Sequence, residues 1–171
     1  MDKLASELIF KHLQMNDTNF FWGTGIDETR FAKPHDKKGN LYNDSTIKNK
    51  SASAAFGVLT TVEDYSKFLI YVMNGAGLKK KLWEEMLANQ TQIKAHQYYG
   101  LGWIVDEIKS EIVITHGGVG EGTQTIVFML PKSKQGLVIF TNCGNGGDAY
   151  IPVIQKYLRK EGQEIIDVET K

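Results

Sequence analysis

Residues 99–142 carry the pattern that decides the fold, and they read YGLGWIVDEIKSEIVITHGGVGEGTQTIVFMLPKSKQGLVIFTN. Within this stretch, four short runs are rich in β-branched and aromatic residues: 100–105, 112–115, 125–130 and 136–141. Turn-forming residues separate them, most clearly at 106–110 and 131–135, as expected between β-strands. Connections this short join neighbouring strands that run in opposite directions. The stretch therefore predicts an antiparallel sheet.

Helical patterns flank the predicted strands. The clearest helix begins after Thr61, whose hydroxyl can accept a hydrogen bond from a free N–H of the first turn, and Asp64 favours the positive helix end. It ends at Asn74-Gly75, and its apolar face comprises Val62, Tyr65, Phe68, Leu69, Val72 and Met73. Apolar spacing close to the helical period predicts further helices at about 2–14, 79–89 and 149–159.

Residues 19–56 show no sustained period and are rich in Gly, Asn, Asp and Lys. We expect an extended segment that lies across other parts of the protein, held by aromatic residues such as Trp22, Phe31 and Tyr42. Helices and antiparallel strands together predict an α+β fold. We assign residues 1–160 to one domain, in which 1–98 form a helical and long-loop part and 99–160 form the antiparallel strands plus a C-terminal helix. Residues 161–171 are predicted to be a polar tail.

The composition excludes several classes of function. Apolar residues make up 42% of the chain, and 20 basic residues balance 20 acidic ones, which gives no electrostatic reason to expect a nucleic acid partner. No apolar run reaches the length of a membrane span or a signal peptide. Cys143 is the single cysteine, and His12, His35 and His96 stand at no ligand spacing. We therefore expect no metal and no cofactor.

Three stretches in one order carry a family resemblance. They are residues 54–68 (AAFGVLTTVEDYSKF), residues 99–103 (YGLGW), and residues 115–120 (THGGVG), which are followed by a strand, Pro131, another strand and Thr141-Asn142. Together they resemble the C-terminal part of serine β-lactamase and penicillin-binding-protein-like proteins of the class C type, over about residues 5–160. The resemblance implies the C-terminal portion of that α+β fold. It also implies an exported protein or one of the cell envelope, although this chain carries no export signal.

The resemblance implies acyl transfer on a β-lactam, a D-amino-acid peptide or an ester. A serine attacks the substrate carbonyl, assisted by the lysine of a Ser-x-x-Lys motif and by a Tyr-x-Asn motif. A third motif lies on a strand edge beside the substrate, and His116-Gly117-Gly118 matches it. The N–H of Val119 would then be a donor of the oxyanion hole. On residue type alone, His116 could equally be a polar residue at a strand end beside a glycine-rich turn.

Neither of the two other motifs occurs in this sequence in a form that fits the family. The sequence contains no Tyr-x-Asn and no Ser-x-Asn, and its one Ser-x-x-Lys is Ser45-Thr46-Ile47-Lys48. We interpret Ser45 and Lys48 as a chance match, because the polar residues 49–53 follow them instead of the apolar face of a buried helix. The family order also requires the nucleophile upstream of residue 1. We therefore expect no nucleophile in this chain and no activity from it alone.

The expected absence of the family's N-terminal strands has a consequence for association. A sheet face or edge would be left uncovered, so we expect a homodimer, a segment swap, or repacking of the helices on the sheet. Three functional hypotheses remain. The chain is part of a serine hydrolase that acts on a small acyl substrate or peptide, or it is a non-catalytic binding module with the same cleft, or it shares the α+β plan and has an unrelated role.

Overall fold

An antiparallel meander forms the centre of the protein. The computed structural model describes residues 1–23, 26–42, 48 and 50–170. Within them, one sheet has six strands in the order of the chain: β1 (Thr91–Lys94), β2 (Gln97–Tyr99), β3 (Ile104–Glu107), β4 (Ile112–Gly120), β5 (Thr123–Leu130) and β6 (Gln135–Thr141). Every neighbouring pair is antiparallel. The predicted antiparallel sheet and α+β class are confirmed.

Helices precede and follow the sheet. Those before it are α1 (Asp2–Ala5), the π-helical turn η1 (Ser6–Phe10), the 3₁₀ turn η2 (Glu28–Arg30), α2 (Val62–Met73) and α3 (Lys80–Met86). The 3₁₀ turn η4 (Gly146–Ala149) leads into α4 (Tyr150–Thr170). The cap predicted for α2 is confirmed, because the Thr61 hydroxyl accepts from the Asp64 N–H at 3.1 Å. None of the helices in the described part is both long enough and apolar enough to cross a bilayer.

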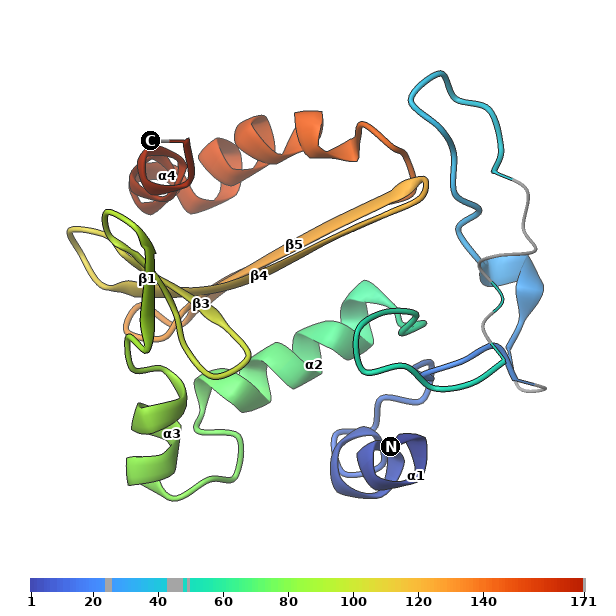
Figure 1. Cartoon of the computed structure of the whole chain (residues 1–171), viewed down its shortest axis with the longest axis horizontal. Helices are drawn as coiled ribbons and strands as arrows, with labels where there is room; N and C mark the ends of the chain where they lie inside the picture. The colour runs from blue at the N-terminus through green and yellow to red at the C-terminus, as the bar shows by residue number, and fades with distance from the viewer. Residues whose placement is uncertain (24–25, 43–47, 49, 171) are drawn as a thin grey trace.

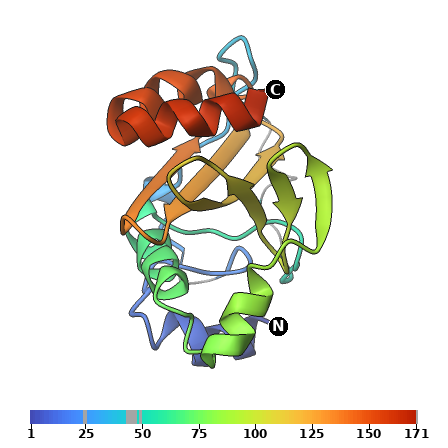
Figure 2. The ribbon, with the colours of Figure 1, turned by 90° about the vertical axis from the view of Figure 1, so that its left-hand side faces the viewer.

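The sheet lies between two helical layers, with α4 on one face and α2 on the other (Figures 1 and 2). Successive residues of a strand point to opposite faces, and β4 and β5 use both. Val113 and Phe128 pack into the core under α4, while Ile114 and Val127 pack into the core under α2. A strand buried on both faces reads as a continuous apolar run rather than an alternating one. Both faces of the sheet are therefore covered, and what remains open is an edge.

The predicted strand 100–105 is wrong over its first four residues. Residues 100–103 form the connection between β2 and β3, and Gly102 has a φ of +82°. The N–H of Leu101 donates to the Met86 carbonyl at 2.8 Å, and a Cβ on Gly100 would lie 2.7 Å from that oxygen. Both glycines are therefore required by the backbone. Strand β1 was not predicted, because its residues TQIK are largely exposed and lack an apolar period.

The predicted polar tail is also wrong over residues 161–170. This segment is helical, and Ile165 is fully buried. Arg159 (φ 49°, ψ −114°) interrupts α4, so that its second half folds back beside the first, as Figure 2 shows. A Cβ on Gly162 would lie 2.6 Å from the Ile154 carbonyl. Only a glycine permits this approach, which brings Ile165 onto the sheet.

Candidate functional site

Half of strand β4 has an open edge. Strand β3 pairs with β4 only as far as Ile104 opposite Thr115, whereas β5 continues to pair with β4 as far as Gly120. Residues 116–120 therefore have a strand on one side only. The free side lies above the N-terminal half of α2, in the middle of the molecule (Figure 1).

The register shows which backbone groups reach this edge. The N–H of Ile108 donates to the Glu111 carbonyl across the β3–β4 turn at 3.1 Å. In an antiparallel ladder, every second residue directs both its N–H and its C=O to the same neighbour. Residues 113 and 115 therefore face β3, and the same alternation directs the backbone groups of Gly117 and Val119 to the open side. The Val119 N–H therefore points away from β5, to the open side of β4.

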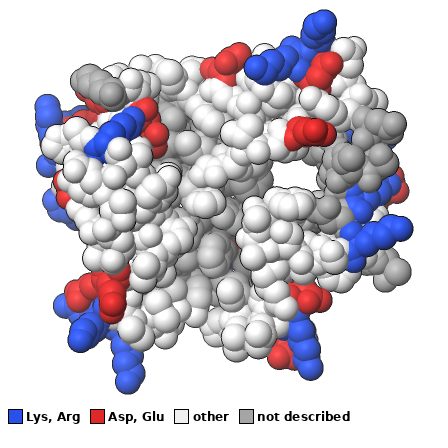
Figure 3. All heavy atoms as spheres, viewed as in Figure 1, with Lys and Arg blue, Asp and Glu red and all other residues white. Residues whose placement is uncertain are grey.

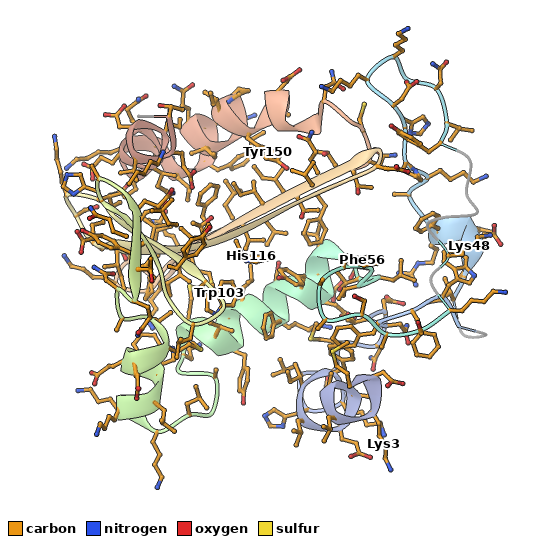
Figure 4. The ribbon with its side chains drawn as sticks, in the orientation of Figure 1. Lys3, Lys48, Phe56, Trp103, His116 and Tyr150 are labelled. Atoms are coloured by element: carbon orange, nitrogen blue, oxygen red, sulfur yellow. The ribbon has the colours of Figure 1, made fainter. Side chains whose placement is uncertain are left out.

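The His116 side chain lies on the α2 face of the sheet, the same face as Ile114. Its ring stands edge-on to Trp103, with 6.1 Å between centroids, and Trp103 stacks on Phe68 of α2 at 6.3 Å. Figure 4 shows His116 and Trp103 side by side between the sheet and α2. The glycine-rich connection 100–103 therefore has a role that its sequence did not reveal: it holds an aromatic ring against His116.

Beyond His116, glycines leave β4 without side chains on the face toward α2. Gly118 follows His116 on the same face, and a Cβ there would lie 3.1 Å from the Thr125 hydroxyl. Gly117, Gly118 and Gly120 are all exposed, and the Val119 side chain is 84% exposed. A strand without side chains on its cleft face allows a ligand to approach its backbone closely.

A groove of about 580 Å³ continues from the end of β4, lined among others by Lys37, Tyr42, Val119, Glu121 and Gln124. The long loop forms its wall, because a Cβ on Gly122 would lie 2.6 Å from the Tyr42 ring. The expectation that this segment lies across other parts of the protein is therefore confirmed for the residues around Pro34, His35 and Tyr42, which contact Gly122. In Figure 3, the surface around the centre of this view is uncharged, and the charged side chains gather at its rim.

Of the chance match Ser45-x-x-Lys48, only Lys48 is described, and it does not lie at this site. Ser45 lies outside the described residues. The Lys48 ammonium bonds to Glu28 at 2.6 Å and lies 4.7 Å from the centre of the Trp22 ring. Figure 4 places Lys48 at the outer side of the long loop, far from His116.

The backbone of His35 pairs with that of Cys143 in an isolated bridge, while His12 and His96 make contacts elsewhere. His12 contacts Tyr71, His35 contacts the Asn142 carbonyl, and His96 pairs with Glu107 at 4.0 Å. The Cys143 thiol bonds to the Asp36 carbonyl at 3.2 Å. Among the described residues, no three side chains of His, Cys, Asp or Glu converge in a way that could hold a metal ion.

A sequence profile of the family described as Beta-lactamase matches residues 1–154. The chain belongs to the beta-lactamase family. The resemblance inferred from the three sequence stretches is thereby confirmed, so the likeness is not limited to a shared α+β plan. The role of the chain stays a prediction. A comparison with curated protein sequences found no match.

Several solved structures have a fold similar to that of this chain. It is similar to a penicillin-binding protein from Bacillus halodurans (TM-score 0.74, 16% identity, 90% of this chain and 49% of that chain). It is also similar to a D-stereospecific amidohydrolase from Streptomyces sp. (0.76, 23%, 92% and 48%). An octameric penicillin-binding protein homologue from Pyrococcus abyssi matches with a TM-score of 0.70, 21% identity, and 82% and 33% coverage. At these sequence identities, the likeness shows a shared fold and nothing further. The chain spans less than half the length of each of the three solved chains.

Proposed function

We propose that this beta-lactamase family chain supplies one wall of an acyl-transfer site, acting on a β-lactam, a D-amino-acid peptide or an ester. The observation that carries the proposal is the open edge of β4 beside His116. An extended acyl substrate can lie along this edge as an added strand and bond to the backbone groups of Gly117 and Val119. The uncharged surface around the edge suits a substrate of low charge near its reacting carbonyl.

The residues would divide the work as follows. The N–H of Val119 donates to the oxygen that becomes negative when the carbonyl is attacked, and a single donor of this kind contributes roughly 100-fold or more to rate in serine hydrolases. Gly117 aligns the substrate through its backbone, and Gly118 leaves room for it. His116, held by Trp103, supplies a polar group at the cleft. The chain offers no matched nucleophile or base, so these groups bind a substrate without turning it over.

Turnover assays test the first half of this proposal. The purified chain, its His116→Ala variant and its Ser45→Ala variant would be incubated with a chromogenic cephalosporin, a p-nitrophenyl ester and a D-amino-acid amide. We expect no hydrolysis above the His116→Ala background for any substrate. Hydrolysis by the wild-type chain that disappears in Ser45→Ala would show that the dismissed serine is the nucleophile.

A second assay tests the role of the open edge itself. If the coding region upstream of residue 1 supplies Ser-x-x-Lys and Tyr-x-Asn in frame, the longer protein should hydrolyse one of these substrates. Gly118→Val should then lower kcat/KM by about 100-fold or more, because the valine side chain covers the edge that the substrate occupies. Gly23→Val, in the long loop and outside β4, is the matched control, because a Cβ there would meet only the Phe21 ring at 3.5 Å. Unchanged kinetics in Gly118→Val would refute the assignment of the edge.

A non-catalytic binding module is the second candidate function. It is favoured by the fact that the edge, His116 and the groove are all formed by this chain, while the catalytic motifs are not matched in it. Titration with a D-alanyl dipeptide, followed by NMR, should shift the amide signals of Gly117 and Val119. Binding without turnover in the longer protein would favour the binding module over the hydrolase.

A further inference from the structure

A row of polar side chains crosses the face of the sheet that α4 covers. Lys94 of β1 lies opposite Gln97 of β2, and Gln97 lies opposite Asp106 of β3. Asp106 in turn lies opposite Val113 of β4, whose side chain packs into the core under α4. Residues directly opposite each other in a ladder share one face of the sheet. The row therefore points toward α4 and away from the face that carries His116.

Within this row, the Asp106 carboxyl lacks one hydrogen-bond partner. Asp106 is fully buried, and one of its oxygens accepts from the Gln97 amide at 3.0 Å. The other oxygen is buried without a partner among the described residues. A buried polar atom without a hydrogen bond is unfavourable. Because Asp106 has no exposed surface, its neighbours belong to this chain, and the missing donor has to be found among them.

The end of α4 brings a second carboxyl next to Asp106. The Lys94 ammonium donates to the backbone carbonyl of Glu169 at 2.8 Å, which holds the end of the helix over β1. The Glu169 carboxyl lies within hydrogen-bonding reach of Asp106. Two carboxylates cannot bond to each other because neither has a donor, whereas a carboxyl and a carboxylate can share one proton. A proton held by this pair supplies the donor that the buried oxygen lacks.

We propose that Asp106 and Glu169 form a proton-dependent latch, in which the shared proton holds the last turn of α4 (residues 166–170) on the sheet and its loss releases that turn. Without the proton, two negative charges lie side by side where Asp106 has no access to water, and each disfavours the other. Release hydrates both charges. It exposes little apolar surface, because Ile166 is the only buried side chain among residues 166–170.

The other groups around the pair do not replace the proton. Lys94 faces the pair from β1, but its ammonium is already bonded to the backbone of α4. Gln97 and Val113 face it from β2 and β4 and carry no charge. His96 and Glu107, on the adjacent turn, pair with each other at 4.0 Å. Release should therefore follow the titration of the carboxyl pair.

The release is confined to the end of α4. Arg159, with a φ of 49°, divides the helix, and the half before it contributes Ile154 and Leu158 to the core. These side chains stay in place when the last turn leaves, and segments with few buried side chains open more easily than the core. The latch is independent of the proposed acyl-transfer site, because it lies on the face of the sheet opposite to His116.

The direction of the pH effect follows from the burial of Asp106. Burial, opposed by the hydrogen bond from Gln97 and by the charge of Lys94, raises the pKa of Asp106 to about 7. The latch is therefore closed below this pH and opens as the pH rises through it. Between about pH 6 and about pH 8, the opening equilibrium should shift roughly 10-fold toward the released turn.

Hydrogen exchange, corrected for the intrinsic effect of pH on amide exchange, measures this shift. The protection of the amides of residues 167–170 should fall roughly 10-fold between these two pH values. Low concentrations of urea should leave their exchange almost unchanged, because a local opening exposes little surface. The amides of residues 154–158 should exchange far more slowly and become faster with urea. An equal urea dependence of the two groups would overturn the latch, since the opening would then be global.

One variant and a matched control identify the groups that carry the effect. Asp106→Asn keeps the oxygen that accepts from Gln97 and offers Glu169 a permanent donor, so the protection of residues 167–170 should no longer change with pH. Glu164→Gln, in the same half of α4, loses a carboxylate that accepts from the Ser110 hydroxyl at 3.5 Å, and should keep the full 10-fold change. A wild-type protein whose protection does not depend on pH would overturn the proposal. So would an Asp106→Asn variant that retains the wild-type pH dependence.

Discussion

The buried carboxyl of Asp106 should make the stability of this protein depend on pH in the neutral range. Asp106 lies on β3 and is 0% exposed. One of its oxygens accepts from the Gln97 amide at 3.0 Å, and the other has no hydrogen-bond partner among the described residues. Lys94 of β1 approaches from one side, but its ammonium donates to the Glu169 carbonyl of α4 at 2.8 Å. The Glu169 carboxylate adds a second negative charge beside Asp106.

Burial, and then the neighbouring Glu169, raise the pKa of Asp106 from 3.8 to about 7. Because the pKa is raised in the folded state, the contribution of this carboxyl to stability is complete below its unfolded value and is lost as the pH rises through about 7. A shift of about three units corresponds to about 4 kcal/mol. Most of this loss of about 4 kcal/mol falls between about pH 5 and about pH 8. The free energy of unfolding should therefore fall by about 3 kcal/mol between these two pH values.

Urea unfolding at these two pH values, followed by circular dichroism, measures the effect, and Asp106→Asn isolates its source. Asparagine keeps the oxygen that accepts from Gln97 and turns an amide group toward Glu169 in place of a carboxylate. The variant should therefore show almost no change of stability over this range, and at about pH 8 it should be more stable than the wild-type protein by about 2 kcal/mol. Glu169→Gln should weaken the pH dependence in part, because it removes the second negative charge.

The ion pair of His96 and Glu107 lies on the neighbouring turn, so both proteins would also be compared in a His96→Gln background. Parallel pH profiles of the wild-type protein and Asp106→Asn would refute the reasoning. The pH dependence would then come from other groups, and Asp106 would be ionised in the folded state at neutral pH.

Three further changes have expected outcomes that urea unfolding can check. Asp64→Ala should lower the free energy of unfolding by about 2 kcal/mol at neutral pH, because the carboxylate accepts from the Asp17 N–H at 2.7 Å and from the Lys67 ammonium at 2.7 Å. Although burial opposes its ionisation, these hydrogen bonds hold the pKa of Asp64 below 3.8. The loss of stability in Asp64→Ala should therefore shrink only as the pH falls below about 4. A loss of stability that is constant with pH would contradict this prediction. Gly100→Ala should cost about 2 kcal/mol through its approach to the Met86 carbonyl, and Gly162→Ala a similar amount through Ile154. Gly23→Ala, whose Cβ would meet only the Phe21 ring at 3.5 Å, is their control, and equal effects in all three variants would contradict the steric argument.

Local patterns determined the fold class and most of the elements. The apolar runs of β4, β5 and β6, the short links between them, and the cap at Thr61 depend on residues close together in the chain, and each is confirmed by the structure. The family was likewise readable from the spacing of the residues around Tyr99 and His116, because their order along the chain is itself a sequence property. The role of His116 to Val119 in catalysis stays a prediction, since no catalytic partner is matched in this chain.

Only the tertiary structure decided what depends on distant segments. The residues 100–103 have the composition of a strand, but they form the connection between β2 and β3. The hydrogen bond from Leu101 to the Met86 carbonyl, which holds them there, joins residues 15 positions apart in the sequence. The sequence of residues 161–171 resembles a polar tail, because most residues around the buried Ile165 and Ile166 are charged or polar. The kink at Arg159 and the small size of Gly162 return them to the sheet. Which edge of a sheet stays open is set by pairing between strands, and no local pattern records it.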